Sequence, residues 1–266
     1  MIGKNWIRDQ KRGLRMMSFS TNGLGRTIGW LTFFAMIILA WLAMFMMARM
    51  SGVDVIGRPV GDNMMPMETF GALFPMWAIM MAAMMLPTMI PTLRSYEDLM
   101  ASANGTRAGW MGVLLGYFII WAAFGALISF AQVLLLDWGL IDGLGIAASG
   151  WFAATLLIVV GLFQFSRTKE MCHGVCHSPA MYFVGHWKTG FSGGLRMGLG
   201  LGAFCVGCCW GFMALGFVGG VMSLLWMGLA TLFMILEKVP QIGHKVTKPM
   251  GVLLIAAGLS VAVATL

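Results

Sequence analysis

Two Cys-His pairs stand four residues apart in the segment EMCHGVCHSP, residues 170–179. In a helix, residues four apart share a face, so the two cysteines would lie on one face and the two histidines on an adjoining one. A turn is the alternative, because Gly174 weakens a helix and Pro179 limits it. In either form, four metal-binding side chains fall within six residues: Cys172, His173, Cys176 and His177.

Several kinds of chemistry compete for this segment. Its CxxxCH spacing is one residue longer than the CxxCH motif of c-type haem attachment. Two cysteines and two histidines could satisfy a tetrahedral zinc ion, although the segment has no evident subdomain for zinc to fold. A transient redox pair would also fit this spacing, and so would an incidental cluster that binds no ligand. A stable disulfide is disfavoured if the segment faces a reducing compartment.

Three more cysteines lie within the apolar segment LGAFCVGCCWGFMALGF. Cys205, Cys208 and Cys209 stand at i, i+3 and i+4 and therefore share one face of a helix. Counted from Arg196 at 1.5 Å per residue, they lie roughly 14–20 Å along the helix, near the centre of a bilayer. A single buried cysteine is usually a small apolar side chain, but three on one face indicate metal ligands.

The chain contains 27 methionines, several of which form rows. Thioethers are soft, neutral ligands that favour Cu(I), and they avoid the cost of burying carboxylates in lipid. The alternative is that methionine serves as a flexible apolar filler. The candidates for metal binding lie in two places, the helical rows that include Met81 and Met85 and the loop residues Met64, Met65 and Met67.

The elements that must position these side chains are membrane helices. The chain is 59% hydrophobic and 10% charged, whereas soluble domains carry about 25% charged residues. A polytopic all-α bundle in contact with membrane lipid is therefore expected. The net charge of +7 does not indicate nucleic-acid binding, because the basic residues stand between apolar segments, as membrane topology requires.

Seven apolar segments predict about seven spans, with six as the alternative because the fourth and the last are short. Pro75, Pro87 and Pro91 are expected to kink or end the second helix. No internal repeat is obvious, and residues 1–266 are predicted to form a single integral membrane domain. The segments are about 27–48, 70–91, 108–136, 148–165, 197–218, 220–236 and 249–266.

The basic residues also predict the orientation. With seven spans, all of the 17 Lys and Arg residues except Arg49 and Arg58 fall on one side, which the positive-inside rule assigns to the cytoplasm. The N-terminus, including the basic segment 1–26, and the Cys/His loop 166–196 are then cytoplasmic. This side of the membrane disfavours haem attachment and stable disulfides.

Four segments resemble a bacterial family of predicted metal-binding integral membrane proteins, a domain of unknown function that includes tyrosinase-associated copper chaperones. The resemblance implies a multi-pass protein of the bacterial cytoplasmic (inner) membrane that binds metal. The segments are WAIMMAAMMLPTMIP (77–91), KEMCHGVCHSPAMYF (169–183), LGAFCVGCCWGFM (201–213) and GGVMSLLWMGLATLFMILEK (219–238).

The leading hypothesis is therefore a non-enzymatic protein that binds Cu(I), with zinc as the alternative ion, and delivers or moves copper for a cuproenzyme client. The Cys/His loop would capture the ion, and the three helix cysteines would form an intramembrane site. A competing hypothesis is a thiol redox protein that passes electrons across the membrane. A third is a structural or assembly subunit of a larger membrane complex. No nucleotide-binding or hydrolase motif stands out.

Overall fold

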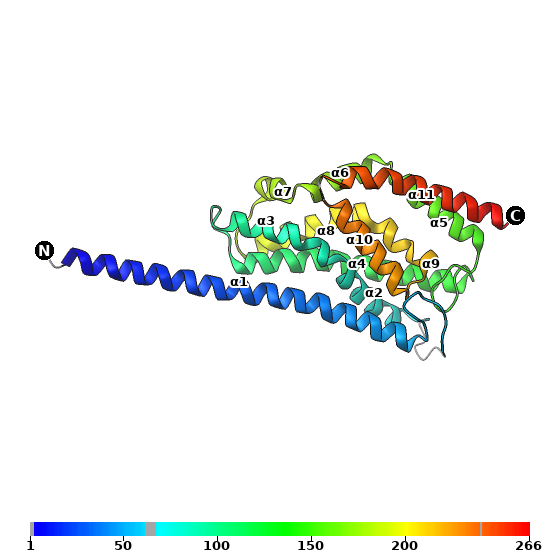
Figure 1. The fold of residues 1–266 in the computed structure, drawn as a ribbon, viewed down its shortest axis with the longest axis horizontal. Coiled ribbons are helices and arrows are strands. Elements are labelled where there is room, and N and C mark those ends of the chain that lie inside the picture. Colours follow the sequence, from blue (N-terminus) through cyan, green and yellow to red (C-terminus); the bar gives the residue numbers. More distant parts are fainter. Residues whose placement is uncertain (1–2, 62–67, 240) are drawn as a thin grey trace. The chain divides into compact units, whose positions relative to one another are not determined.

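The computed structural model describes residues 3–61, 68–239 and 241–266, and most of them are helical (Figure 1). Within these ranges the extended pairings are two isolated β-bridges, Val53 with Pro59 and Ile141 with Ala147. The predicted all-α class is confirmed. Met64, Met65 and Met67 lie outside the described residues, so their role as metal ligands stays a prediction.

The chain divides into two compact units, Met1–Leu39 and Ala40–Leu266. The first unit is a length of helix α1, which continues into the second unit. The prediction of a single integral membrane domain over residues 1–266 stays a prediction. The elements are α1 (Gly3–Met50), α2 (Phe70–Met85), the 3₁₀ helix η1 (Pro87–Met89), α3 (Ile90–Met100), α4 (Arg107–Asp137), α5 (Gly150–Phe163), α6 (Arg167–His177), α7 (Pro179–His186), α8 (Gly190–Ala214), α9 (Gly216–Gly219), α10 (Leu224–Glu237) and α11 (Gly243–Ala264).

Five of the seven predicted spans coincide with helices long and apolar enough to cross a membrane. The predicted fourth span is the 14-residue helix α5, which reaches that length only together with α6, across a bend of 62°. The predicted sixth span is α10, also 14 residues, which at 1.5 Å per residue is about 21 Å long. The five are Gly23–Met50, Phe70–Met100, Arg107–Asp137, Gly190–Gly219 and Lys245–Ala264. The count of seven and the cytoplasmic N-terminus stay predictions.

Glycines let α4 and α8 pack along each other in the most extensive helix pair of the second unit. A Cβ added at Gly112, Gly116, Gly194 or Gly198 would lie 2.0–2.4 Å from a carbonyl oxygen of the other helix. No side chain fits there, so the two backbones approach as they do in small-residue membrane interfaces. This packing fixes the position of α8, which carries three of the cysteines.

Two of the three prolines predicted to affect the second helix mark a real break. Helix α2 ends at Met85, Pro87 begins η1, and Pro91 lies in the first turn of α3. Pro75 lies inside α2 without ending it. A proline cannot donate a backbone hydrogen bond, and the Thr88 hydroxyl instead donates to the Met85 carbonyl at 2.8 Å.

Two loops at the ends of α1 and α4 have the same construction. In each, one aspartate oxygen accepts two backbone N–H bonds: Asp54 from Ile56 and Arg58, and Asp142 from Leu144 and Ile146. One loop contacts the first turn of α10 and the other contacts α9. The two contacts are the bond from the Leu225 amide to the Val55 carbonyl at 2.9 Å and the bond from the Ala147 amide to the Phe217 carbonyl at 2.7 Å.

The predicted Cys/His loop is largely helical. Ser166 begins α6 by accepting a bond from the Lys169 amide at 3.1 Å, a standard N-cap. Pro179 then begins α7. Helix α6 packs against α8, so the loop cysteines lie beside the helix that carries the others. Of the two forms expected for CHGVCH, the helix is the one observed.

Candidate metal centre

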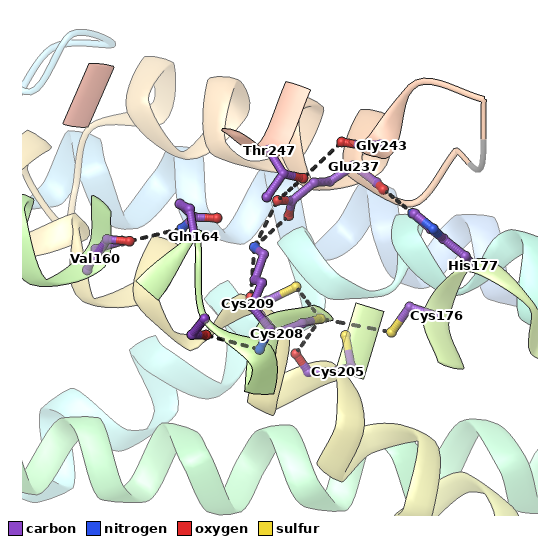
Figure 2. A network of polar contacts seen from close by, with 12 residues as sticks. Val160, Gln164, Cys176, His177, Cys205, Cys208, Cys209, Glu237, Gly243 and Thr247 are labelled. Carbon is purple, nitrogen blue, oxygen red and sulfur yellow. Dashed lines mark hydrogen bonds and ion pairs between the residues drawn. The ribbon is translucent and has the colours of Figure 1, made fainter. Parts of the chain in front are cut away.

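Three cysteine sulfurs from two helices meet at one point, as Figure 2 shows. The Sγ atoms of Cys176 on α6 and of Cys205 and Cys208 on α8 all lie within 4.8 Å of one another. The Cys176 and Cys208 sulfurs are 3.9 Å apart. Cys205 and Cys208 share a face of α8, as their spacing predicts. We call these three residues the sulfur triangle.

The remaining two cysteines lie beside the triangle. The Cys209 sulfur is 3.3 Å from that of Cys208 but falls outside the group of mutually close sulfurs. Cys172 lies against α8 at Gly207, where an added Cβ would be 2.8 Å from its sulfur. None of the five cysteines forms a disulfide. The predicted loop and helix sites are therefore adjacent, with Cys176 as the loop residue that joins the helix pair.

A small polar group surrounds Cys205. The Tyr117 hydroxyl lies 3.0 Å from its sulfur, and Lys238 Nζ donates to the same sulfur at 3.2 Å. Lys238 also donates to the Thr88 hydroxyl at 2.8 Å, and that hydroxyl lies 3.3 Å from the Tyr117 hydroxyl. Burial acts to lower the pKa of the Lys238 amine, but the Cys205 sulfur and neighbouring groups raise it well above its usual value. Lys238 therefore presents a cation to the cysteines.

A second cation is tied to the backbone of Cys208. Lys169 Nζ donates to the Cys208 carbonyl at 3.0 Å and pairs with the Glu237 carboxylate at 2.8 and 3.0 Å. The Lys169 and Glu237 side chains are only 2% and 1% exposed. Thr247 of α11 donates to the same carboxylate at 2.9 Å. This buried network links α6, α8, α10 and α11 beside the sulfur triangle (Figure 2).

The two predicted histidine ligands face a different neighbour. Their rings lie 4.0 Å apart between centroids, and His173 is buried. His177 Nε2 is 2.6 Å from the Glu237 carbonyl oxygen, so that nitrogen acts as a donor to the backbone. Within the described ranges, the group of close metal-binding atoms contains sulfurs and no histidine nitrogen. A metal-binding role for His173 and His177 stays a prediction.

The methionines of the second predicted span are buried. Met81 and Met85 are 0% and 1% exposed. Met89, the third member of their i, i+4 row, is also buried, and so are the members of the second row, Met76, Met80 and Met84. An apolar filler and an internal metal ligand would both be buried, so burial does not distinguish them. The metal-binding role of Met81 and Met85 stays a prediction.

The spacing of the sulfur triangle suits a soft metal ion. With a metal–sulfur bond of about 2.3 Å, three sulfurs around a trigonal ion stand about 4.0 Å apart. The Cys176–Cys208 distance of 3.9 Å already matches this value. The other two sulfur–sulfur distances are at most 4.8 Å, so small side-chain rotations would bring them to it. Thiolate ligands select Cu(I) and zinc over hard cations. The residues present therefore fit a soft ion.

Sequence reasoning missed the polar side chains around the triangle. From the sequence, Lys169 and Lys238 were used only as positive charges that predict the orientation in the membrane, and Tyr117 and Glu237 had no assigned role. A signal existed for two of them, since Glu237 and Lys238 form the EK that ends the quoted segment 219–238. An ionisable residue next to or inside an apolar span is itself a candidate functional residue.

Neither the curated proteins nor the solved structures contain a match to the chain. A family model described as PpoB2, copper chaperone, matches residues 74–261, a range that includes all five cysteines and the polar side chains around them. Because the match covers well over half of the 266 residues, the chain belongs to the PpoB2 copper chaperone family.

Proposed function

We propose that this chain is a membrane-embedded chaperone that holds Cu(I) on the sulfurs of Cys176, Cys205 and Cys208, two of them as thiolates, and hands it to a cuproenzyme client. The observation that carries the proposal is the sulfur triangle, three sulfurs within 4.8 Å of one another and largely screened from water. A group of three is smaller than the four-ligand sets of structural zinc sites. Cu(I) is therefore the favoured ion, with zinc as the alternative.

The charge balance of the site also favours a monovalent ion. With two of the three sulfurs as thiolates and the third as a neutral thiol, the site and one Cu(I) carry a net charge of –1, and the Lys238 ammonium 3.2 Å from Cys205 offsets it. A buried charge without a partner costs several kcal/mol, so a site whose net charge is balanced is favoured. The second cation, Lys169, is already paired with Glu237, so it adds no net charge.

The proposed location is the bacterial cytoplasmic membrane. Five helices of sufficient length and apolarity support embedding in lipid, and the distribution of Lys and Arg supports a cytoplasmic N-terminus. On this view Cys172, His173 and His177 capture the ion near the membrane surface, and Met81 and Met85 offer weak thioether contacts deeper in the bundle. The family's chaperone role implies a client such as tyrosinase, and no catalytic activity of its own.

The test is metal content after anaerobic loading of the full-length protein in detergent. With Cu(I) in excess, about one tightly held copper per chain is expected, and replacement of Cys176, Cys205 and Cys208 by serine together removes it. Cys172→Ser is the matched control, because this cysteine lies outside the triangle and its loss is expected to slow loading without lowering the final content. Equal copper in the triple variant and the wild type contradicts the proposal.

A thiol redox protein is the second candidate function. The sulfur of Cys208 lies 3.3 Å from that of Cys209 and 3.9 Å from that of Cys176, so disulfide exchange needs little motion. Mass spectrometry after mild oxidation and alkylation separates the two functions. A reversible Cys176–Cys208 disulfide formed at a defined potential, with no copper retained after loading, favours the redox function.

A further inference from the structure

A cavity of about 280 Å³ opens directly beside the sulfur triangle. It lies where three elements end: α2 breaks at Pro87, α6 ends at His177, and α10 ends at Glu237. Its walls include Thr88, Ser95 and Cys176. Two of these ends are next to prolines, Pro87 and Pro179, which begin η1 and α7.

One cysteine of the triangle reaches the cavity and two stand behind it. Cys176 is half-buried and lies on the cavity wall, whereas Cys205 and Cys208 are each 1% exposed. A ligand in the cavity therefore meets Cys176 first. This order suits transfer of an ion from the cavity to the buried pair.

The cavity wall is positively charged. Lys238 lines it, and no carboxylate is among the described residues of the wall. An ammonium has three N–H donors, and two of those of Lys238 go to Thr88 and Cys205. The third donor can meet an anionic group of a ligand. The wall thus combines a soft nucleophile and a cation.

We propose that this cavity binds a low-molecular-weight anionic thiolate that carries Cu(I), and that copper passes from it to Cys176. The inference rests on the proposed function. The volume of 280 Å³ is at the lower limit of ligand pockets, which run from about 300 to 1,000 Å³. It suits a carrier of a few residues and excludes insertion of a folded domain. The carboxylate of such a carrier pairs with Lys238.

The transfer is a ligand exchange without change of oxidation state. The carrier arrives as a Cu(I) ion held by two carrier thiolates. The Cys176 sulfur forms a copper–sulfur bond, one carrier–copper bond breaks, and the proton of the Cys176 thiol goes to the departing thiolate. A second exchange with a buried cysteine releases the other carrier thiol in the same way. Copper stays Cu(I), and two carrier thiols leave.

The experiment compares copper donors by anaerobic stopped-flow on the full-length protein in detergent. The donors are Cu(I)–glutathione, whose carrier has carboxylates, Cu(I)–cysteamine, whose carrier has an ammonium group and no carboxylate, and Cu(I)–acetonitrile, whose ligand is small and uncharged. Transfer from glutathione is expected to be about tenfold faster than from cysteamine, which corresponds to about 1.4 kcal/mol. Equal rates from the two thiols overturn the proposal.

A variant that fills the cavity tests its location. Ser95→Phe places a ring at the wall, and the hydrogen bond that Ser95 donates, to the Pro91 carbonyl at 2.9 Å, stays within its own helix. We expect transfer from glutathione to slow about tenfold, or about 1.4 kcal/mol, while loading from acetonitrile changes less than about twofold. Ser102→Phe is the matched control at an exposed position outside the cavity and should behave as wild type. An unchanged glutathione rate in Ser95→Phe overturns the proposal.

A competition measurement on the wild type keeps the test independent of any variant's folding. S-methylglutathione is anionic but has no thiol, and at millimolar concentration it should slow transfer from Cu(I)–glutathione and leave Cu(I)–acetonitrile loading unchanged. Absence of inhibition overturns the cavity assignment alone. Failure of the wild type to take up copper even from acetonitrile overturns the proposed function, and this inference with it.

Discussion

Replacing Lys169 by methionine should destabilise the protein strongly, although the substitution changes the size of the side chain little. The Lys169 ammonium holds both Glu237 oxygens and the Cys208 carbonyl, and both charged side chains are at most 2% exposed. Without Lys169, Glu237 keeps the Thr247 hydroxyl but loses its cation. Removing one partner of a buried ion pair costs about 3–5 kcal/mol, because the other charge stays buried.

The expected shift in melting temperature follows from that cost. For chains of about 150–250 residues, 1 kcal/mol corresponds to about 2–4 °C, so Lys169→Met should lower Tm by about 6–20 °C. The double variant Lys169→Met with Glu237→Gln removes the stranded carboxylate charge and should recover at least half of the loss, because a neutral amide is far cheaper to bury than an ion.

The assay is thermal unfolding of the detergent-purified protein, followed by intrinsic fluorescence, with the wild type, the single variants and the double variant measured together. Lys188→Met, at an exposed position, is the control and should shift Tm by no more than about 2 °C. A Lys169→Met protein that melts at the same temperature as the wild type would show that the Lys169–Glu237 pair does not stabilise the fold. So would a double variant no more stable than the single one.

Three further changes test separate parts of the account. Gly198→Val should abolish the monodisperse folded protein in size-exclusion chromatography, because an added Cβ meets the Val113 carbonyl oxygen at 2.2 Å, whereas Gly228→Val, with nothing within 4 Å, should not. Tyr117→Phe removes the hydroxyl 3.0 Å from the Cys205 sulfur and should weaken Cu(I) affinity about two- to tenfold in competition with a chromophoric chelator. Unchanged affinity contradicts a role for that contact. Asp142→Ala loses two backbone hydrogen bonds and should lower the free energy of unfolding by about 1–3 kcal/mol. Asp142→Asn keeps an acceptor oxygen and should lose less than half of that stability.

Local spacing was enough to predict part of the candidate site. The i, i+3 relation of Cys205 and Cys208 requires a shared helix face, and the structure has these two sulfurs together. The break after α2 was also predictable, since Pro87 and Pro91 cannot continue its backbone hydrogen bonds. Both inferences depend only on residues within a few positions of each other.

Spacing could not tell which loop cysteine joins the pair. Cys172 and Cys176 are one turn apart on the same face of α6, so periodicity treats them alike. The choice depends on how α6 crosses α8. Gly207 gives Cys172 a place against the helix, while Cys176 extends to the Cys208 sulfur.

The buried polar network was out of reach for the same kind of reason. Counting charges assigns Lys169 and Lys238 to a solvated membrane surface, because most lysines stay in water or in the interface. Lys169 is 1% exposed instead, since its partner Glu237 lies 68 positions further along the chain. Pairing over that distance follows from the packing of helices, which no local pattern encodes.

The most direct test of the central claim is X-ray absorption at the copper edge on the anaerobically loaded full-length protein. We expect Cu(I) with a shell of two or three sulfurs and no histidine nitrogen, and a sulfur count that falls in Cys205→Ser. A shell dominated by nitrogen or oxygen, or one unchanged when Cys176, Cys205 and Cys208 are all replaced by serine, contradicts this expectation.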